Sequence, residues 1–414
     1  MRVLVIGGGG REHAIVRALA ADPAVTELHA APGNPGIAAL AQLHAVSGSD
    51  PAAVAALAQR LAADLVVIGP EAPLVAGVAD ALRAAGIAAF GPDAAAARIE
   101  GSKVFAKEIM AAAGIPTAAA RVTSTAAEAA LALDTFGPPY VVKDDALAAG
   151  KGVVVTEDRA LAEAHAASCR QVVIEEYLDG PEVSLFAVAD GQTAVPLLAA
   201  QDFKRAVDGD RGPNTGGMGA YVPLPWAPPG LADEVLRTVI RPALDELARR
   251  GTPYRGLLYT GLALTSKGVR VVEFNARFGD PETQVVLDRL ASPLAGLLQA
   301  SAVGDLGSAP ALSWHPGAAV TVVVAAEGYP GVPVRGDVIT VREVPGGVPG
   351  YLLHAGTALA GPDLVTAGGR VLNAVGAGPD LASARAAAYA VAECAGFRGG
   401  WYRHDIAERA STGG

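Results

Sequence analysis

The sequence predicts a multidomain protein of the α/β and α+β classes. We expect an N-terminal doubly wound parallel sheet, a central domain with a mobile lid subdomain, and a small β-rich C-terminal domain. In the first hundred residues, short apolar strands alternate with Ala-rich helical segments, which is typical of a doubly wound sheet. From about residue 319 the chain consists of short β-rich segments with glycines and prolines. A length of 414 residues suits about two to four domains.

The N-terminal elements follow from their apolar runs. Segments 52–62 and 75–84 have helical composition. Buried strands are expected around them, at 3–6, 27–30, 65–68 and 87–90.

A domain boundary is expected near residue 100, where GSKVFAKEIMAAAGIP begins a helix that Pro116 ends. A strand, a helix and two strands, with a Gly-rich turn at 148–152, then predict the lid. A long polar loop without secondary structure follows at 201–221, and helices are expected at 231–249 and 381–394. We therefore predict three domains, at 1–100, 101–318 (with the lid at about 120–190) and 319–414.

Composition and charge argue against several classes of function. A net charge of −10 argues against nonspecific nucleic-acid binding, which needs a basic surface. No apolar run reaches the roughly 18 to 20 residues that span a bilayer, and the start of the chain is unlike a signal peptide. Cys169 and Cys394 form no CxxC pair, which favours reduced thiols. We expect a cytoplasmic protein with small-molecule substrates, without nucleic-acid or membrane partners, and a monomer, with a dimer as the alternative.

The first candidate site is GGGGREHA at 7–14, which follows a strand and opens a helix. Its backbone N–H groups would form an anion cradle at the helix N-terminus. A dinucleotide site fits poorly, because the third glycine of GxGxxG falls on Glu12 or His13 and no acid ends the second strand. The pattern favours a phosphate on a smaller ligand, with a tight turn that binds nothing as the alternative.

The second candidate is YVVKDDALAAGKGVVV at 140–155. Lys143 ends an apolar strand, and a loop with Gly150, Lys151 and Gly152 leads into the next strand. Glycines let a backbone close over phosphates while lysines neutralise their charge. The alternative is a hairpin with solvated lysines.

A hinge-like segment, VVIEEYLDGPEVS, follows at 172–184. Backbone groups near Tyr177 and Leu178 would read an adenine edge, and Glu182 would accept hydrogen bonds from ribose hydroxyls. A solvated acidic turn explains this pattern equally well.

The most informative stretch is VRVVEFNARFGDPETQ at 269–284. Glu273 and Asn275 alternate along a strand and therefore share a face, where their oxygens suit Mg²⁺. Arg277 continues the alternation and would stabilise a transferring phosphoryl group. A solvated strand face is the alternative, but the apolar neighbours argue against it.

The segment QDFKRAVDGDRGPNTGGMGAY at 201–221 offers charges and amides that suit a zwitterionic or phosphorylated substrate. A flexible surface loop is the alternative.

Taken together, these segments resemble the phosphoribosylamine–glycine ligase family of ATP-grasp enzymes over essentially the whole chain. The resemblance implies an ATP-grasp fold for the central domain and ligation of glycine to 5-phosphoribosylamine in de novo purine biosynthesis. It also implies ATP as co-substrate, Mg²⁺ or Mn²⁺ as cofactor, and a glycyl phosphate intermediate. The segments that carry it are GGGGREHA, APGNPG, GPEAPLVAGVAD, GSKVFAKEIM, LAAGKGVVV, GPNTGGMGAY and EFNARFGDPETQ.

The resemblance implies roles for individual residues as well. Metal ligation is implied for Glu273 and Asn275, and catalysis for Arg277 and Lys143. The implied ATP-binding residues are Lys103, Lys143, Gly150, Lys151, Gly152, Glu175, Tyr177, Leu178 and Glu182. The implied substrate-binding residues are Gly8, Gly9, Gly10, Asn34, Glu71, Pro73, Lys204, Asn214, Thr215, Gly216, Gly217, Asp280, Pro281 and Glu282.

The chain departs from the family pattern at four positions. Asp144 and Ala146 replace an alanine and a glycine of the lid loop, and Phe203 replaces a histidine. Thr260 stands where many ATP-grasp enzymes carry a first metal-binding acid, so the number of ions is open. Three other functions are considered: a different ATP-grasp ligase, a nicotinamide-dependent oxidoreductase, and a catalytically silent nucleotide-binding regulator.

Overall fold

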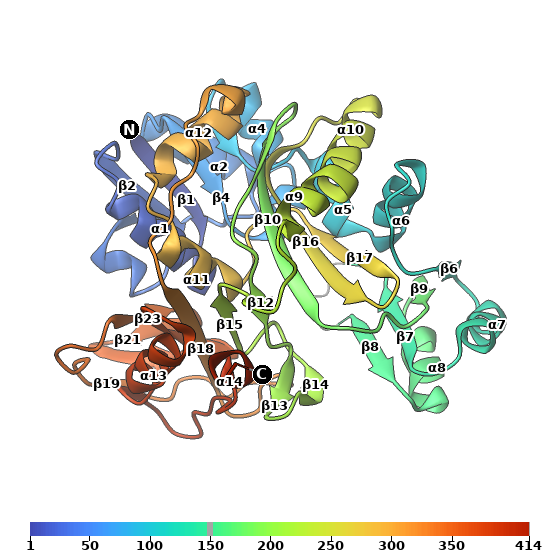
Figure 1. The fold of residues 1–414 in the computed structure, drawn as a ribbon. Helices are drawn as coiled ribbons and strands as arrows, with labels where there is room; N and C mark the ends of the chain where they lie inside the picture. Colours follow the sequence, from blue (N-terminus) through green and yellow to red (C-terminus); the bar gives the residue numbers. More distant parts are fainter. Residues whose placement is uncertain (147–151, 414) are drawn as a thin grey trace.

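The computed structural model describes residues 1–146 and 152–413. Its N-terminal region contains a five-stranded parallel sheet in the order β3-β2-β1-β4-β5, which is the predicted doubly wound arrangement (Figure 1). Helices cover both faces, so the central strands are continuously apolar. The strands are β1 (Arg2–Gly7), β2 (Glu27–Pro32), β3 (Gln42–Leu43), β4 (Leu65–Ile68) and β5 (Ala88–Phe90).

The helices of this region include two that were not predicted, η1 and α5, and one predicted helix has a different form. The helix expected at 75–84 is interrupted at Gly77, whose φ of 87° is left-handed, and forms two helices. The helical elements are α1 (Gly10–Ala20), η1 (Ile37–Ala39), α2 (Pro51–Arg60), α3 (Glu71–Val75), α4 (Val78–Ala84) and α5 (Ala94–Gly101).

The lid is a four-stranded antiparallel sheet in the order β6-β9-β7-β8, at the right of Figure 1. Two helices pack on it around a small apolar core of their own. The second helix was not predicted; it begins after Asp158, whose carboxylate accepts from the N–H groups of Ala160 and Leu161. The elements are β6 (Ala120–Thr123), α7 (Ala126–Phe136), β7 (Tyr140–Asp144), β8 (Val153–Thr156), α8 (Arg159–Ser168) and β9 (Val172–Glu175).

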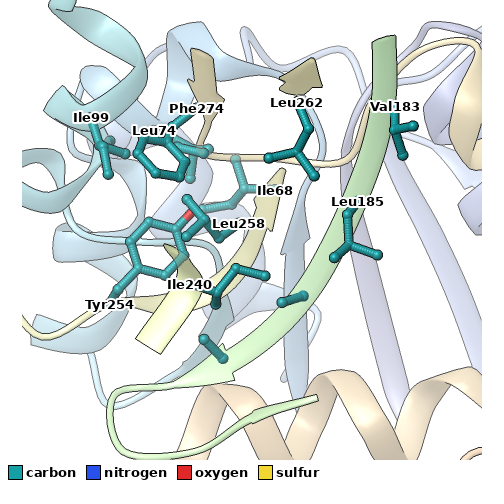
Figure 2. Close-up of a cluster of buried hydrophobic side chains, with 14 of the residues drawn as sticks. Ile68, Leu74, Ile99, Val183, Leu185, Ile240, Tyr254, Leu258, Leu262 and Phe274 are labelled. Atoms are coloured by element: carbon teal, nitrogen blue, oxygen red, sulfur yellow. The ribbon is translucent and has the colours of Figure 1, made fainter. Parts of the chain in front are cut away.

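The central sheet has the order β11-β10-β16-β17 and packs against the N-terminal region. Figure 2 shows this shared core, in which Ile68 and Leu74 of the N-terminal region belong to the same buried cluster as Leu258 of the central sheet. The strands are β10 (Glu182–Asp190), β11 (Ala194–Pro196), β16 (Arg255–Thr265) and β17 (Gly268–Asn275). The helical elements are α6 (Lys103–Ala112), α9 (Leu231–Val235), η2 (Leu236–Ile240), α10 (Arg241–Arg249), α11 (Glu282–Arg289), α12 (Leu294–Val303) and η3 (Leu306–Ser308).

The helix predicted at 231–249 is continuous but contains a π-helical turn at η2. The prediction that 201–221 is a long loop without secondary structure is wrong, because the segment contains four short strands. They are β12 (Gln201–Asp202), β13 (Arg205–Val207), β14 (Arg211–Asn214) and β15 (Gly219–Val222).

Two of those strands join the sheet of the C-terminal region, whose order is β12-β15-β18-β23-β20. A boundary at 318/319 would therefore run through a sheet, and the three domain limits remain a proposal. The other strands are β18 (Ala318–Ala325), β19 (Thr340–Val341), β20 (Gly350–His354), β21 (Thr357–Ala360), β22 (Asp363–Thr366), β23 (Arg370–Gly378) and β24 (Ala395–Gly396).

The last helices are α13 (Leu381–Ala392), which was predicted at 381–394, and α14 (Glu408–Ser411). Among the described residues, none of the helices has the length and apolar character needed to span a bilayer.

Candidate active site

A cavity of about 1380 Å³ is lined by residues of the lid, the central sheet and the C-terminal region. Most of the predicted site residues line it. They are Glu71, Lys103, Lys143, Gly152, Glu175, Tyr177, Leu178, Glu182, Lys204, Asn214, Thr215, Gly216, Glu273, Asn275, Arg277, Asp280 and Glu282. Gly150 and Lys151 lie outside the described residues.

At the base of the lid, two lysines share one carboxylate. Glu175 at the end of β9 has Oε2 at 2.7 Å from Nζ of Lys143 and Oε1 at 2.9 Å from Nζ of Lys107. Lys143 also donates to the carbonyl of Val272 on β17, which joins the lid to the central sheet. The buried pair of ammonium groups exceeds its shared anion by one charge, so the cluster favours an added anion such as a phosphate.

Sequence reasoning missed Lys107, although it lies one turn after Lys103 on α6. Burial lowers the pKa of Lys107, against the effect of Glu175. Lys103 itself is less enclosed, and its Nζ lies 3.3 Å from the carbonyl oxygen of Ala146. Asp144, the other departure in this loop, ends β7 and donates its N–H to Gly152.

The three predicted polar side chains of the facing segment lie together, but only Glu273 and Asn275 are on β17, because the strand ends at Asn275 and Arg277 lies in the bend that follows. Asn275 donates to Glu273 at 3.3 Å, and Arg277 is 3.4 Å from Oδ1 of Asn275. Burial raises the pKa of Glu273, but the ammonium groups of Lys204 and Lys143 outweigh it and hold that pKa below its ordinary value. Glu273 is therefore an ionised oxygen donor near neutral pH.

Arg277 is held by two carboxylates. Its Nη2 lies 2.9 Å from Glu100 at the end of α5, and its Nε lies 3.3 Å from Glu71 on α3. Burial opposes the charge of Arg277, but Glu100 and Glu71 raise its pKa. Sequence reasoning assigned Glu71 to a substrate and did not single out Glu100.

The residues fit a divalent ion. Glu273 and Asn275 present two oxygens on one face of β17, and a Mg²⁺-like ion completes such a set with water and phosphate oxygens. Thr260 does not lie on the face of Glu273, which corrects the expectation that it occupies the position of a first metal-binding acid. It pairs with Phe274, and opposed residues of antiparallel strands share a face, so it points away from Glu273 into the core.

A second charged group lies beside β12. Nζ of Lys204 is 2.7 Å from Oε2 of Glu182. Burial, together with the charges of Glu282 and Glu182, raises the pKa of Asp202 to about 7. Asp202 was not predicted as a site residue. Phe203, which replaces the family's histidine, has its ring 6.1 Å from that of Tyr221 and so takes a packing role.

The turn after β17 and the first residue of α11 supply two more carboxylates. Ser184 donates to Glu282 at 2.9 Å in a buried hydrogen bond. Asp280 forms an ion pair with Arg370 of β23. Arg370 was not predicted as a site residue from the sequence. Pro281 packs against Gly217, and neither of these two lines the cavity.

The N-terminal glycine loop differs from the open anion cradle that was expected. Gly9 donates its N–H to the Glu12 carboxylate at 2.6 Å, as in a capping box. Asn34 donates to the carbonyl oxygens of Gly8 and His354. The predicted residues of this region that do not line the cavity are Gly8, Gly9, Gly10, Asn34 and Pro73.

Lys143 of the lid sheet and two lysines of α6 thus share one cavity with the carboxylate and amide of β17 and with the guanidinium that follows this strand. Together with the fold, this arrangement defines an ATP-grasp ligase.

The comparisons define the family. Three models of phosphoribosylglycinamide synthetase match the chain, the N domain at 1–100, the ATP-grasp (A) domain at 101–283 and the C domain at 319–409. The phosphoribosylamine–glycine ligase of Streptomyces coelicolor is 62% identical over 99% of this chain and 100% of its own length. The phosphoribosylamine–glycine ligase of Corynebacterium ammoniagenes is 56% identical over 100% of this chain and 99% of its own length. The chain therefore belongs to the phosphoribosylglycinamide synthetase family and is an ATP-grasp carbon–nitrogen ligase.

Solved structures agree with this assignment. The crystal structure of phosphoribosylamine–glycine ligase from Thermotoga maritima has a TM-score of 0.84 and 36% identity, and the match covers 98% of this chain and 100% of that chain. A biotin carboxylase from Campylobacter jejuni, with 15% identity and a TM-score of 0.73 over 97% of this chain and 93% of that chain, shares the fold.

Proposed function

We propose that this chain ligates glycine to 5-phosphoribosylamine and converts ATP to ADP and phosphate, producing glycinamide ribonucleotide for de novo purine biosynthesis. Family membership over the full chain supports the reaction. The single observation that carries the chemistry is the group formed by Glu273 and Asn275 at the end of β17 and Arg277 just after it, which shares a cavity with Lys143.

In the first step, a carboxylate oxygen of glycine attacks the γ-phosphorus, forming glycyl phosphate and releasing ADP. Lys103 and Lys143 hold the phosphates, and Arg277 stabilises charge on the transferring group. Glu273 and Asn275 bind a divalent ion, Mg²⁺ or Mn²⁺, which when bound neutralises phosphate oxygens.

The carboxylate of Glu175 forms ion pairs with two lysines. We therefore propose that Glu175 orients these lysines and does not bind adenosine. Tyr177 and Leu178 line the cavity where an adenine would lie against the hinge backbone. Glu182 is at once the partner of Lys204 and the acceptor for ribose hydroxyls.

In the second step, the amine of phosphoribosylamine attacks the carbonyl carbon of glycyl phosphate, the C–O bond to phosphate breaks, and the leaving phosphate takes up the proton that the amine loses. The chain has to position the two groups and exclude water, because the acyl phosphate is already activated. We assign the amine substrate to the side of the cavity near Asp280, whose Oδ2 would lie 3.8 Å from a Cβ on Gly9. The N-terminal glycine loop therefore borders this side.

A coupled ADP-release assay tests the proposal, with ATP, Mg²⁺, glycine and freshly generated phosphoribosylamine, each omitted in turn. We expect ADP release to require all of them, and glycinamide ribonucleotide to form in equal amount. Release that depends on bicarbonate instead of glycine would indicate a carboxylase, and release without phosphoribosylamine would contradict the ligation. A parallel series with Mn²⁺ identifies the preferred ion, and sedimentation analysis tests the proposed monomer.

A further inference from the structure

Arg370, the first residue of β23, connects two segments that lie far apart in the sequence. Its Nη1 donates to the carbonyl oxygen of Asp280 at 2.7 Å and also to that of Gly216. Its Nη2 lies 3.3 Å from the carboxylate of Asp280. Because Gly216 belongs to GPNTGGMGAY and Asp280 to RFGDPETQ, one guanidinium joins the two segments that are most specific to this ligase.

We propose that Arg370 is a positioning residue that fixes the pocket for the amine substrate by fastening the GPNTGG segment to the GDPE turn. The inference rests on the proposed function. It assigns to the C-terminal region a role in substrate recognition that no motif in the sequence indicated.

The glycines of the fastened segment are required by this contact. A Cβ on Gly216 would lie 2.9 Å from Cζ of Arg370, so the guanidinium plane packs directly on the backbone there. Gly217 has a φ of 107°, and a Cβ on it would lie 2.4 Å from Cδ of Pro281. The pair of glycines thus allows Arg370 and the GDPE turn to approach the same stretch of backbone.

A tyrosine of the C-terminal region holds the same segment. Gly216 donates its N–H to the hydroxyl of Tyr329 at 2.9 Å, while its carbonyl accepts from Arg370. Both polar groups of this peptide position are therefore satisfied by the C-terminal region, which leaves the segment a single orientation.

On the other side, Asp280 is oriented by two donors. Arg370 holds Oδ2, and Gln284 of α11 donates to Oδ1 at 2.8 Å. A planar guanidinium can bind a carboxylate and carbonyl oxygens at once in a fixed geometry, which a lysine ammonium cannot reproduce. The orientation of Asp280 beside the N-terminal glycine loop then depends on Arg370.

Among the residues that the structure describes, none of the hydrogen-bond partners of Arg370 is assigned to ATP. Loss of Arg370 should therefore affect the amine substrate and spare the nucleotide. This selectivity separates a positioning role from a general structural one.

The test compares Arg370→Met and Arg370→Lys with the wild-type enzyme and with a matched control, Arg289→Met. Arg289 also binds a carboxylate and a carbonyl oxygen and is mostly buried, but it does not line the cavity. Steady-state kinetics give kcat and the KM of each substrate, and calorimetry gives the Kd of ATP with Mg²⁺.

Both Arg370 variants should lose about 10- to 100-fold in kcat/KM for phosphoribosylamine, as expected for a small misplacement of a bound reactant. The KM of glycine and the Kd of ATP should stay within about twofold of wild type, and Arg289→Met should match wild type in all three. Unchanged kcat/KM for phosphoribosylamine would overturn the role of Arg370. An equally large rise in the KM of glycine or in the Kd of ATP would overturn it as well.

If Arg370→Met does not fold, Gly216→Ala serves as the second variant, since its methyl group displaces the guanidinium. The same selective loss supports the proposal, and wild-type kinetics overturn it. The wild-type arm separates the two hypotheses: an inactive wild type refutes the proposed ligation, whereas an active wild type with unaffected variants refutes only the role of Arg370.

Discussion

Replacing Arg277 by methionine would separate its catalytic and structural contributions. The side chain of Glu100 is 7% exposed and that of Arg277 is 17% exposed. The substitution therefore leaves the buried carboxylate of Glu100 without its ion-pair partner. Removing one partner of a buried ion pair costs about 3–5 kcal/mol. Because Glu71, the other partner, is partly exposed, we expect the lower end, about 3 kcal/mol in the free energy of unfolding.

The loss should depend on pH. Burial already raises the pKa of Glu100, and without Arg277 it would rise further. A carboxyl whose pKa is raised in the folded state binds a proton there that the unfolded chain releases, so its penalty grows as the pH rises. Arg277→Met should therefore be least stable, relative to wild type, at pH 8, and the difference should shrink toward pH 5.5.

Urea unfolding at the two pH values, with kcat and the KM of ATP measured in parallel, tests this reasoning. Adding Glu100→Gln to Arg277→Met should restore most of the stability but not kcat. Arg159→Met, which removes an exposed ion-pair partner on α8, is the control and should change stability little. Wild-type stability of Arg277→Met at pH 8 would refute the buried ion pair, and recovery of kcat in the double variant would reduce Arg277 to a structural residue.

Three further changes test other parts of the site and fold. Glu273→Ala combined with Asn275→Ala should abolish ligation and leave the circular dichroism spectrum unchanged, because the cavity loses its metal-binding oxygens; wild-type turnover would remove the metal role. His13, whose pKa is lowered to about 4 by burial and by a neighbouring histidine, is neutral in the folded state. The free energy of unfolding should therefore fall by up to about 3 kcal/mol as the pH drops from 6.5 to 4, and His13→Gln should remove most of that slope in urea titrations. Asp202→Asn should eliminate a step near pH 7 in the profile of kcat/KM, and an identical profile for the variant would show that Asp202 does not control it.

The sequence predicted the elements whose signal is local. The strands β1 and β4 are short apolar runs that are buried on both faces, and β17 was identified by its alternation. Glu273 and Asn275 were found because one strand carries both, and Arg277 lies only two residues beyond the end of that strand.

Groups joined across long sequence separations were missed. Glu100, Lys107 and Arg370 belong to a helix or strand whose composition is ordinary, and their partners are remote, as Asp280 is 90 residues from Arg370. Periodicity reports only which face a residue occupies within its own element. The strands within 201–221 were hidden for the same reason, since β15 is stabilised by pairing with β18 about 100 residues later.

The position expected for a first metal-binding acid was assigned to Thr260, and the assignment is wrong by one residue. Side chains alternate between the faces of a strand, so an error of one position moves a side chain from the cavity to the core. The register shows that Gly261 opposes Glu273, and a glycine offers no metal-binding oxygen from its side chain.

The pairing of β15 with β18 limits how this chain can be shortened. A truncated protein that ends at residue 318 would leave β15 as an open edge and would expose the buried side chains of Tyr221 and Val222. An exposed apolar edge of this kind recruits strands from other molecules. Shortened versions of the protein should therefore keep the last hundred residues, because removing them opens the sheet that carries the GPNTGGMGAY segment.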